Sequence, residues 1–151
     1  MKIRATALLA TLAILLTACG SPPYRPPAVT DSDLNGTWLI RKAELGGKSL
    51  PMPGFALIIN GTEYRAGAVA NGGAPNDRGT LVLFGDEVAG EARRIDVIGL
   101  EGPNKGKRYP AIYRFSGREL EICYDLAEKD RPTDFVSREG TRVLRVTYSK
   151  K

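Results

Sequence analysis

Apolar and polar residues alternate with a period of two over most of the chain after residue 34, in short runs bounded by Gly, Asn and Pro. This is the period of β-strands, whose successive side chains point to opposite faces of a sheet. No run of ten or more residues has convincing helical periodicity. The pattern predicts eight strands, at residues 37–45, 55–60, 62–67, 79–84, 92–99, 107–115, 119–124 and 141–148.

Turn residues connect these runs. Asn60-Gly61 predicts a hairpin with a type I′ turn, which needs positive φ at both central residues. Ser116-Gly117-Arg118 predicts a second hairpin. Pro110 has no N–H to donate to a neighbouring strand, so it marks either a bulge or a strand edge.

Alternation also assigns the faces of the strands. One side of the sixth and seventh strands carries Tyr109, Ala111, Tyr113, Phe115, Leu120, Ile122 and Tyr124. Glu119, Glu121 and Cys123 lie on the opposite side, where the two glutamates are expected to face solvent. A single buried face is implied. Eight short antiparallel strands with tight turns favour an all-β, up-and-down barrel, and a two-sheet sandwich is the alternative.

The first residues have the order of a secretory signal, with Lys2 and Arg4 before an apolar stretch at residues 5–18. As a helix this stretch would rise only about 21 Å, against a hydrocarbon core of about 30 Å, so it is too short to span a membrane. Leu16-Thr17-Ala18-Cys19 resembles the lipobox of bacterial lipoproteins. The resemblance implies cleavage after residue 18 and a lipid anchor on Cys19; an ordinary signal peptidase site nearby is the alternative.

Four prolines between Pro22 and Pro27 predict an extended tether at residues 19–34, followed by one domain at residues 35–151. Cys19 is followed by Gly20 and Ser21 and not by an aspartate. This resembles the pattern of proteobacterial lipoproteins that leave the inner membrane. We therefore expect a lipid-anchored cell-envelope protein, in the outer membrane facing the periplasm, with the inner membrane as the alternative. We also expect a monomer.

Charge and composition exclude several classes of function. The chain has 22 Lys and Arg and 17 Asp and Glu; without Lys2 and Arg4 its net charge is +3, and the two signs are interleaved, so no nucleic-acid surface is expected. The absence of histidine rules out Ser-His-Asp and Cys-His sites and the usual zinc ligand sets. The acidic run at residues 125–134 lacks the spacing of a calcium loop, and Lys129 and Arg131 are expected to pair with its acids. No enzymatic activity, metal or cofactor is expected.

Cysteine usage restricts the fold further. If Cys19 carries lipid, Cys123 has no partner in the chain and no intramolecular disulfide forms. Cys123 lies in a strand-like run, where a lone cysteine is expected to be a small buried hydrophobe.

Two patterns resemble a known family. Gly36-Thr37-Trp38 resembles the Gly-x-Trp signature of lipocalins, and residues 101–135 resemble a lipocalin-like domain of uncharacterised function from planctomycete bacteria. The resemblance implies a barrel closed at one end by Trp38 beneath an arginine of the last strand, either Arg142 or Arg145. The chain stops just after that strand, without the C-terminal helix of typical lipocalins.

An eight-stranded barrel is either filled by side chains or holds one small ligand. If a cavity exists, its predicted lining is Phe55, Tyr64, Tyr109, Tyr113, Leu120, Ile122 and Tyr124; plain core packing is the alternative for each. We expect a membrane-anchored, lipocalin-like lipoprotein that binds a small hydrophobic or amphipathic molecule. The alternative is a protein-interaction module with a filled core, an envelope adaptor or a barrel-type protease inhibitor, which would use the loop at residues 68–78.

Overall fold

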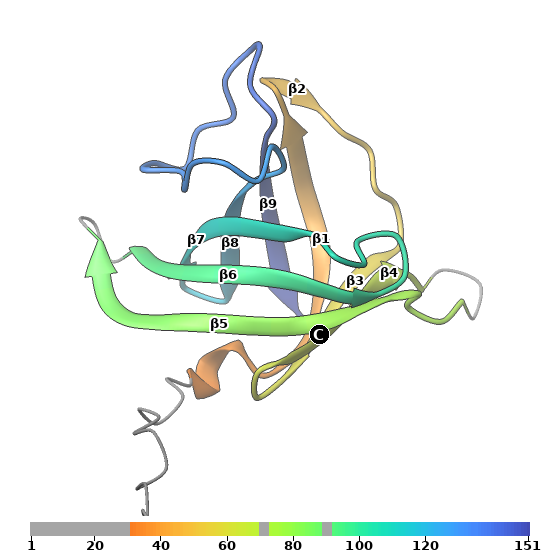
Figure 1. Ribbon diagram of the computed structural model, residues 1–151. Coiled ribbons are helices and arrows are strands. Elements are labelled where there is room, and N and C mark those ends of the chain that lie inside the picture. Colours follow the sequence, from red (N-terminus) through yellow and green to blue (C-terminus); the bar gives the residue numbers. More distant parts are fainter. Residues whose placement is uncertain (1–30, 70–72, 89–91) are drawn as a thin grey trace, which may run out of the picture.

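The computed structural model describes residues 31–69, 73–88 and 92–151, which form a closed antiparallel β-barrel (Figure 1). A short 3₁₀ helix, η1 (Ser32–Leu34), leads into the first strand. The strands are β1 (Gly36–Leu45), β2 (Lys48–Ser49), β3 (Phe55–Asn60), β4 (Glu63–Ala68), β5 (Asp77–Val88), β6 (Ala92–Glu101), β7 (Arg108–Ser116), β8 (Glu119–Asp125) and β9 (Val143–Lys150). Within these residues no helix has the length and apolarity needed to cross a membrane.

The barrel closes because β1 pairs with β9 as well as with β3. From β3 to β9 every strand pairs antiparallel with the next one in sequence, and the two-residue β2 adds to one end of β1. Closure leaves eight strands without a free edge, apart from the small addition of β2. The predicted eight-stranded up-and-down barrel is confirmed, and the sandwich alternative is wrong.

Both predicted hairpins form, but the first turn differs from the prediction. Asn60 pairs with Glu63, so Gly61 and Thr62 are the central residues, and only Gly61 has positive φ (61°). One glycine at the first central position is the requirement of a type II′ turn, and the predicted type I′ turn is wrong. The second hairpin repeats the arrangement, with Gly117 at φ 60°.

Buried side chains form two cores, one inside the barrel and one outside it. The inward residues predicted on β7 and β8 lie in the interior core. On the outer face, Ile112 of β7 and Cys123 of β8 pack against Phe135 of the segment at residues 126–142, called here the outer loop. β8 is therefore buried on both sides, and the prediction of a single buried face is wrong. Cys123 is the expected buried hydrophobe, and burial raises the pKa of its thiol to about 12.

Pro110 lies at a strand edge. It pairs with Asp96 in an unshifted β6–β7 register, while the β7–β8 pairing begins one residue later, at Ala111. Since β7 has a single partner strand at this point, the missing N–H leaves no gap in the sheet. The bulge alternative is wrong.

The folded domain starts earlier than predicted. Leu34 is completely buried, and Asp31 binds Arg93 (2.6 Å) and accepts a hydrogen bond from the Tyr113 hydroxyl (2.8 Å). Residues 31–34, assigned to the tether from the sequence, are thus part of the barrel. The predicted signal peptide, Cys19 and the tether up to residue 30 lie outside the described residues.

Candidate functional site

Trp38 lies at the end of the barrel next to η1, called here the closed end. Its side chain is 2% exposed, and its indole N–H donates to the carbonyl of Leu34 at 2.7 Å. The ring packs against Phe115, with 6.0 Å between the ring centroids, and the ammonium of Lys150 lies 5.1 Å from the indole centroid. Trp38 therefore seals this end of the interior, and its one polar group is satisfied.

The cation over Trp38 is a lysine, so the prediction of Arg142 or Arg145 is wrong. Trp38 pairs with Lys150 at the C-terminal end of β9. Arg142 is exposed and precedes the opposite end of that strand, and Arg145 points outward to Glu121 and Glu44. The Gly-x-Trp signature places the tryptophan but contains nothing about which strand residue covers it.

A cavity of about 300 Å³ occupies the interior between Trp38 and the opposite end, called here the open end. Aliphatic side chains form most of its wall, among them Leu57, Ile59, Leu81, Ile95 and Val97. The more exposed lining residues, among them the half-buried Met52 and Leu126 and the exposed Pro103, belong to the loops of the open end. These loops therefore surround the cavity's route to solvent.

Five of the predicted lining residues line this cavity: Phe55, Tyr64, Tyr109, Ile122 and Tyr124. Tyr113 and Leu120 do not. Both are almost completely buried at the closed end, where the Tyr113 hydroxyl binds Asp31 and Leu120 pairs with Phe115. They point inward as predicted but lie too deep in the barrel to contact the cavity.

A hydrogen-bonded polar group lies at the open end of the cavity. Asp77, 6% exposed, accepts from the Tyr64 hydroxyl (3.3 Å), from the backbone N–H of Asn104 (3.2 Å) and from the Asn104 amide nitrogen (2.7 Å). The Asn104 amide oxygen accepts from the Tyr109 hydroxyl at 3.0 Å. Burial, and then the charge of Asp77, raise the pKa of Tyr64 above its usual value. These contacts tie the loop at residues 102–107 to β4 and β5.

A second polar pair lies deeper, where the Tyr124 and Tyr148 hydroxyls are 3.2 Å apart. Burial raises the pKa of Tyr148 to about 12, although the hydrogen bond with Tyr124 acts in the opposite direction. The pKa of Tyr124 is raised well above its usual value by burial and then by Tyr148. Both side chains line the cavity, so its wall combines apolar rings with hydroxyls.

Gly79 determines where the Tyr64 ring lies. The two residues are paired on β4 and β5, and a Cβ at position 79 would lie 2.5 Å from Cε1 of Tyr64 and 2.0 Å from the carbonyl oxygen of Ile98. No side chain fits there. A glycine at this position lets the tyrosine ring cross the neighbouring strand and reach Asp77.

Asp77 and Asn104 were not predicted from the sequence. The strand predicted at residues 79–84 corresponds to β5, but β5 starts two residues earlier, at Asp77, which pairs with Ala66. Extending the alternation of Leu81 and Gly79 back by two positions would have placed Asp77 on the inward face. For Asn104, a loop residue, the sequence contains no comparable signal.

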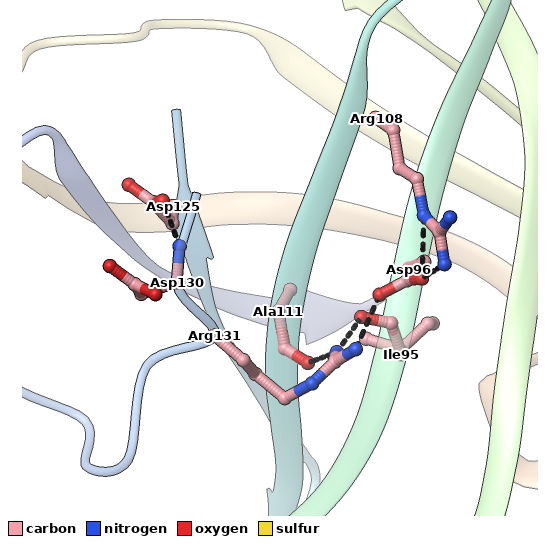
Figure 2. Close-up of polar contacts among 7 residues, drawn as sticks. All are labelled: Ile95, Asp96, Arg108, Ala111, Asp125, Asp130 and Arg131. Atoms are coloured by element: carbon pink, nitrogen blue, oxygen red, sulfur yellow. Dashed lines mark hydrogen bonds and ion pairs between the residues drawn. The ribbon is translucent and has the colours of Figure 1, made fainter. Parts of the chain in front are cut away.

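On the outside of the barrel, Asp96 of β6 binds two arginines (Figure 2). Asp96 is 1% exposed; Arg131 of the outer loop donates to it at 2.6 Å, and Nε of Arg108 donates at 2.8 Å. Arg131 also donates to the carbonyl oxygens of Ile95 (2.7 Å) and Ala111 (2.8 Å). The arginine thus fastens the outer loop across β6 and β7, and the prediction that it pairs with acids of its own loop is wrong.

Asp125, the last residue of β8, organises the first turn of the outer loop. Its carboxylate accepts from the backbone N–H groups of Ala127 (3.0 Å), Lys129 (2.9 Å) and Asp130 (3.0 Å), the last of which appears in Figure 2. Burial alone would raise the pKa of Asp125, but these three donors outweigh it and lower the pKa. The Asp125 carboxylate therefore stabilises the backbone of the outer loop. In the described part of the chain, no group of three acidic or cysteine side chains is arranged to hold a metal ion.

Glu121 is buried, although it was predicted to face solvent. It is 6% exposed and lies between Arg114 (2.7 Å) and Arg145 (2.6 Å) on the outer face of β8. The guanidinium of Arg114 also stacks 4.2 Å from the ring centroid of Phe135. The outer loop therefore covers Glu121, whereas Glu119, next to the hairpin, is exposed as predicted.

Comparison with known proteins finds no matching family model, no matching curated protein and no matching solved structure. The resemblance to a planctomycete lipocalin-like family stays a prediction.

Proposed function

We propose that this chain is a membrane-anchored lipoprotein whose barrel binds a small hydrophobic or amphipathic molecule at the cell envelope. The observation that carries the binding part is the interior cavity of about 300 Å³. This volume is at the lower end of the range of small-molecule pockets, about 300–1,000 Å³. An apolar cavity of about 150 Å³ in another protein binds benzene, so the volume here suits a ligand of roughly a dozen non-hydrogen atoms.

The character of the wall supports an amphipathic ligand. Aliphatic residues line most of the cavity, while the hydroxyls of Tyr64 and Tyr109 lie at the open end beside Asp77 and Asn104. An apolar part would be buried deep in the barrel, with a polar part at this end. The alternative, an interaction module with a filled interior, leaves the cavity without a role.

Binding is tested by enlarging Ala66, a small cavity-lining residue on β4. We expect the purified protein to bind 2-naphthol, an amphipathic probe of suitable size, in a fluorescence titration. Ala66→Leu is expected to weaken binding by about tenfold or more, because the added methyl groups occupy the cavity. Because the cavity has room for the added methyl groups, the free energy of unfolding should change by less than about 1.5 kcal/mol.

The matched control is Val82→Leu, which adds bulk at a half-exposed position on β5. This variant should bind 2-naphthol like the wild type. If a folded Ala66→Leu variant also binds 2-naphthol like the wild type, the proposed role of the cavity is wrong. It is wrong too if the wild type binds neither 2-naphthol nor any of the straight-chain amphiphiles compared below.

The anchoring part of the proposal rests on Cys19 and the lipobox-like residues before it. Two or three acyl chains hold a protein stably at a membrane, since each buried CH₂ contributes about 0.8 kcal/mol. Cells grown with labelled palmitate should incorporate label into the wild-type protein and not into a Cys19→Ser variant. A Cys19→Ser variant that still carries the label would refute lipidation at this cysteine, and unlabelled wild-type protein would refute lipidation altogether.

A further inference from the structure

Asp77 brings a negative charge into an otherwise uncharged cavity. Among the described residues that line the cavity, it alone is charged. Its inward position follows from its pairing with Ala66, because directly paired residues project on the same face of a sheet. Its side chain is 6% exposed, so the carboxylate is largely removed from bulk water.

The partners of this carboxylate are all neutral. Tyr64 and Asn104 supply three hydrogen bonds, and a carboxylate accepts about four. Among the described residues no basic side chain forms an ion pair with Asp77, and the neighbouring Arg78 binds Glu101 on the outside of the barrel. Asp77 therefore keeps an unused acceptor position and an uncompensated charge, an arrangement that costs free energy unless a cation approaches.

The surroundings of Asp77 favour a cation over an anion. Asn104 is held in one orientation, with its amide nitrogen on Asp77 and its oxygen on the Tyr109 hydroxyl. The rings of Tyr64 and Tyr109 line the same region, and tyrosine rings attract cations at their faces. The nearby Lys107 is engaged by Glu128 at 3.1 Å, which reduces its value as a partner for an anionic ligand.

From this arrangement we infer that the cavity selects amphipathic cations, such as primary amines with a short apolar tail, and that their ammonium group binds Asp77. The inference rests on the proposed function and names the chemical class of its ligand. The tail lies along the aliphatic wall of Leu57, Ile59, Leu81 and Val97, and the head group occupies the open end. The ammonium donates to the free position of the carboxylate as a charge-assisted hydrogen bond.

Three eight-carbon compounds with nearly equal apolar tails separate the contribution of the charge from that of the tail. Isothermal titration calorimetry of the full chain at pH 7 would compare octylamine, octanol and octanoate, which are cationic, neutral and anionic. We expect octylamine to bind about tenfold or more tightly than octanol, and octanoate to bind least, because its charge repels Asp77.

Asp77→Asn removes the charge with little change in shape. In this variant octylamine and octanol should bind within about threefold of each other. Asp134→Asn, at a half-exposed carboxylate on the outer loop, is the matched control and should keep the wild-type preference. Circular dichroism establishes that each variant is folded. If Asp77→Asn does not fold, the comparison of octylamine, octanol and octanoate on the wild-type protein alone tests the cation selectivity.

The outcomes separate this inference from the proposed function. If octanol binds as tightly as octylamine, or if folded Asp77→Asn keeps the preference for the amine, the cation selectivity is refuted while ligand binding stands. If octylamine, octanol, octanoate and 2-naphthol all fail to bind, the proposed function itself is refuted.

Discussion

The domain is expected to lose stability steeply between about pH 10 and pH 12, because several tyrosines must stay protonated in the folded state. Burial is the largest cause of the raised pKa of Tyr64, Tyr113, Tyr124 and Tyr148. An unfolded tyrosine ionises near pH 10. Below that pH the stabilisation from the protonated tyrosines is complete. It is lost as the pH rises through their raised pKa values in the folded state; the pKa of Tyr148 is about 12.

The size of the effect follows from the linkage between proton binding and folding. Each such tyrosine removes about 1.4 kcal/mol of stability per pH unit above 10, so four remove about 5 to 6 kcal/mol per unit. Domains are commonly stable by about 5–15 kcal/mol. Circular dichroism against pH should therefore show cooperative unfolding that coincides with the appearance of tyrosinate absorbance.

The Tyr124→Phe/Tyr148→Phe double variant tests the cause. Both partners of one hydrogen bond are replaced by groups of the same shape, so stability at pH 7 should change little. The alkaline midpoint should rise by about one pH unit or more, because two of the four ionising groups are gone. Tyr109→Phe, at a partly exposed tyrosine, should shift the midpoint less. An unchanged midpoint in the double variant would show that another group controls alkaline unfolding.

Asp96→Ala is expected to lower the free energy of unfolding by about 3 kcal/mol. The carboxylate is completely buried beneath Arg131 and Arg108, and breaking a buried ion pair by removing one partner costs about 3–5 kcal/mol. The lower value applies because the Arg108 side chain is mostly exposed and regains water. Urea unfolding followed by tryptophan fluorescence measures the change.

The matched control is Asp134→Ala, which removes an Asp–Arg pair on the surface of the same outer loop. Asp134 and Arg138 are both well exposed, so this change should cost less than about 1 kcal/mol. Equal losses in the two variants would mean that the Asp96 cluster contributes no more than an ordinary surface ion pair.

Alternation and turn residues were sufficient to predict the barrel. β3 has the predicted bounds, because its alternating residues end at a hairpin turn. The two-residue β2 and the three-residue η1 are too short to show any period. η1 depends instead on contacts that no local pattern contains: Leu34 is buried against the barrel, and Asp31 accepts from the N–H of Asp33 at 3.1 Å.

The residues that line the cavity are predictable from the sequence only in part. A period of two tells which face of a strand a residue occupies, but not how deep along the barrel it lies. Tyr113 and Tyr109 share the inner face of β7, yet Tyr113 is at the closed end and Tyr109 at the open end. Depth depends on the pairing register of all eight strands, which a single strand does not determine.

The buried outer face was missed for a different reason. Glu121 alternates with inward residues, so an outward and solvated position was expected. The outer loop that covers it has no regular period, and it packs through one aromatic residue, Phe135, together with arginine contacts. Polar residues that bury other polar residues leave no hydrophobic pattern to detect.

The chain enters the barrel at the closed end, away from the loops that surround the cavity. The described chain enters through η1 at the closed end, where Asp31 is bound by Arg93 and Tyr113, and Figure 1 shows η1 on the side of the barrel opposite the outer loop. A force applied through the residues before Asp31 therefore acts at the closed end. Under the proposed lipid anchor at Cys19, the loops around the cavity face the aqueous space, so a ligand enters or leaves on the side away from the attachment point.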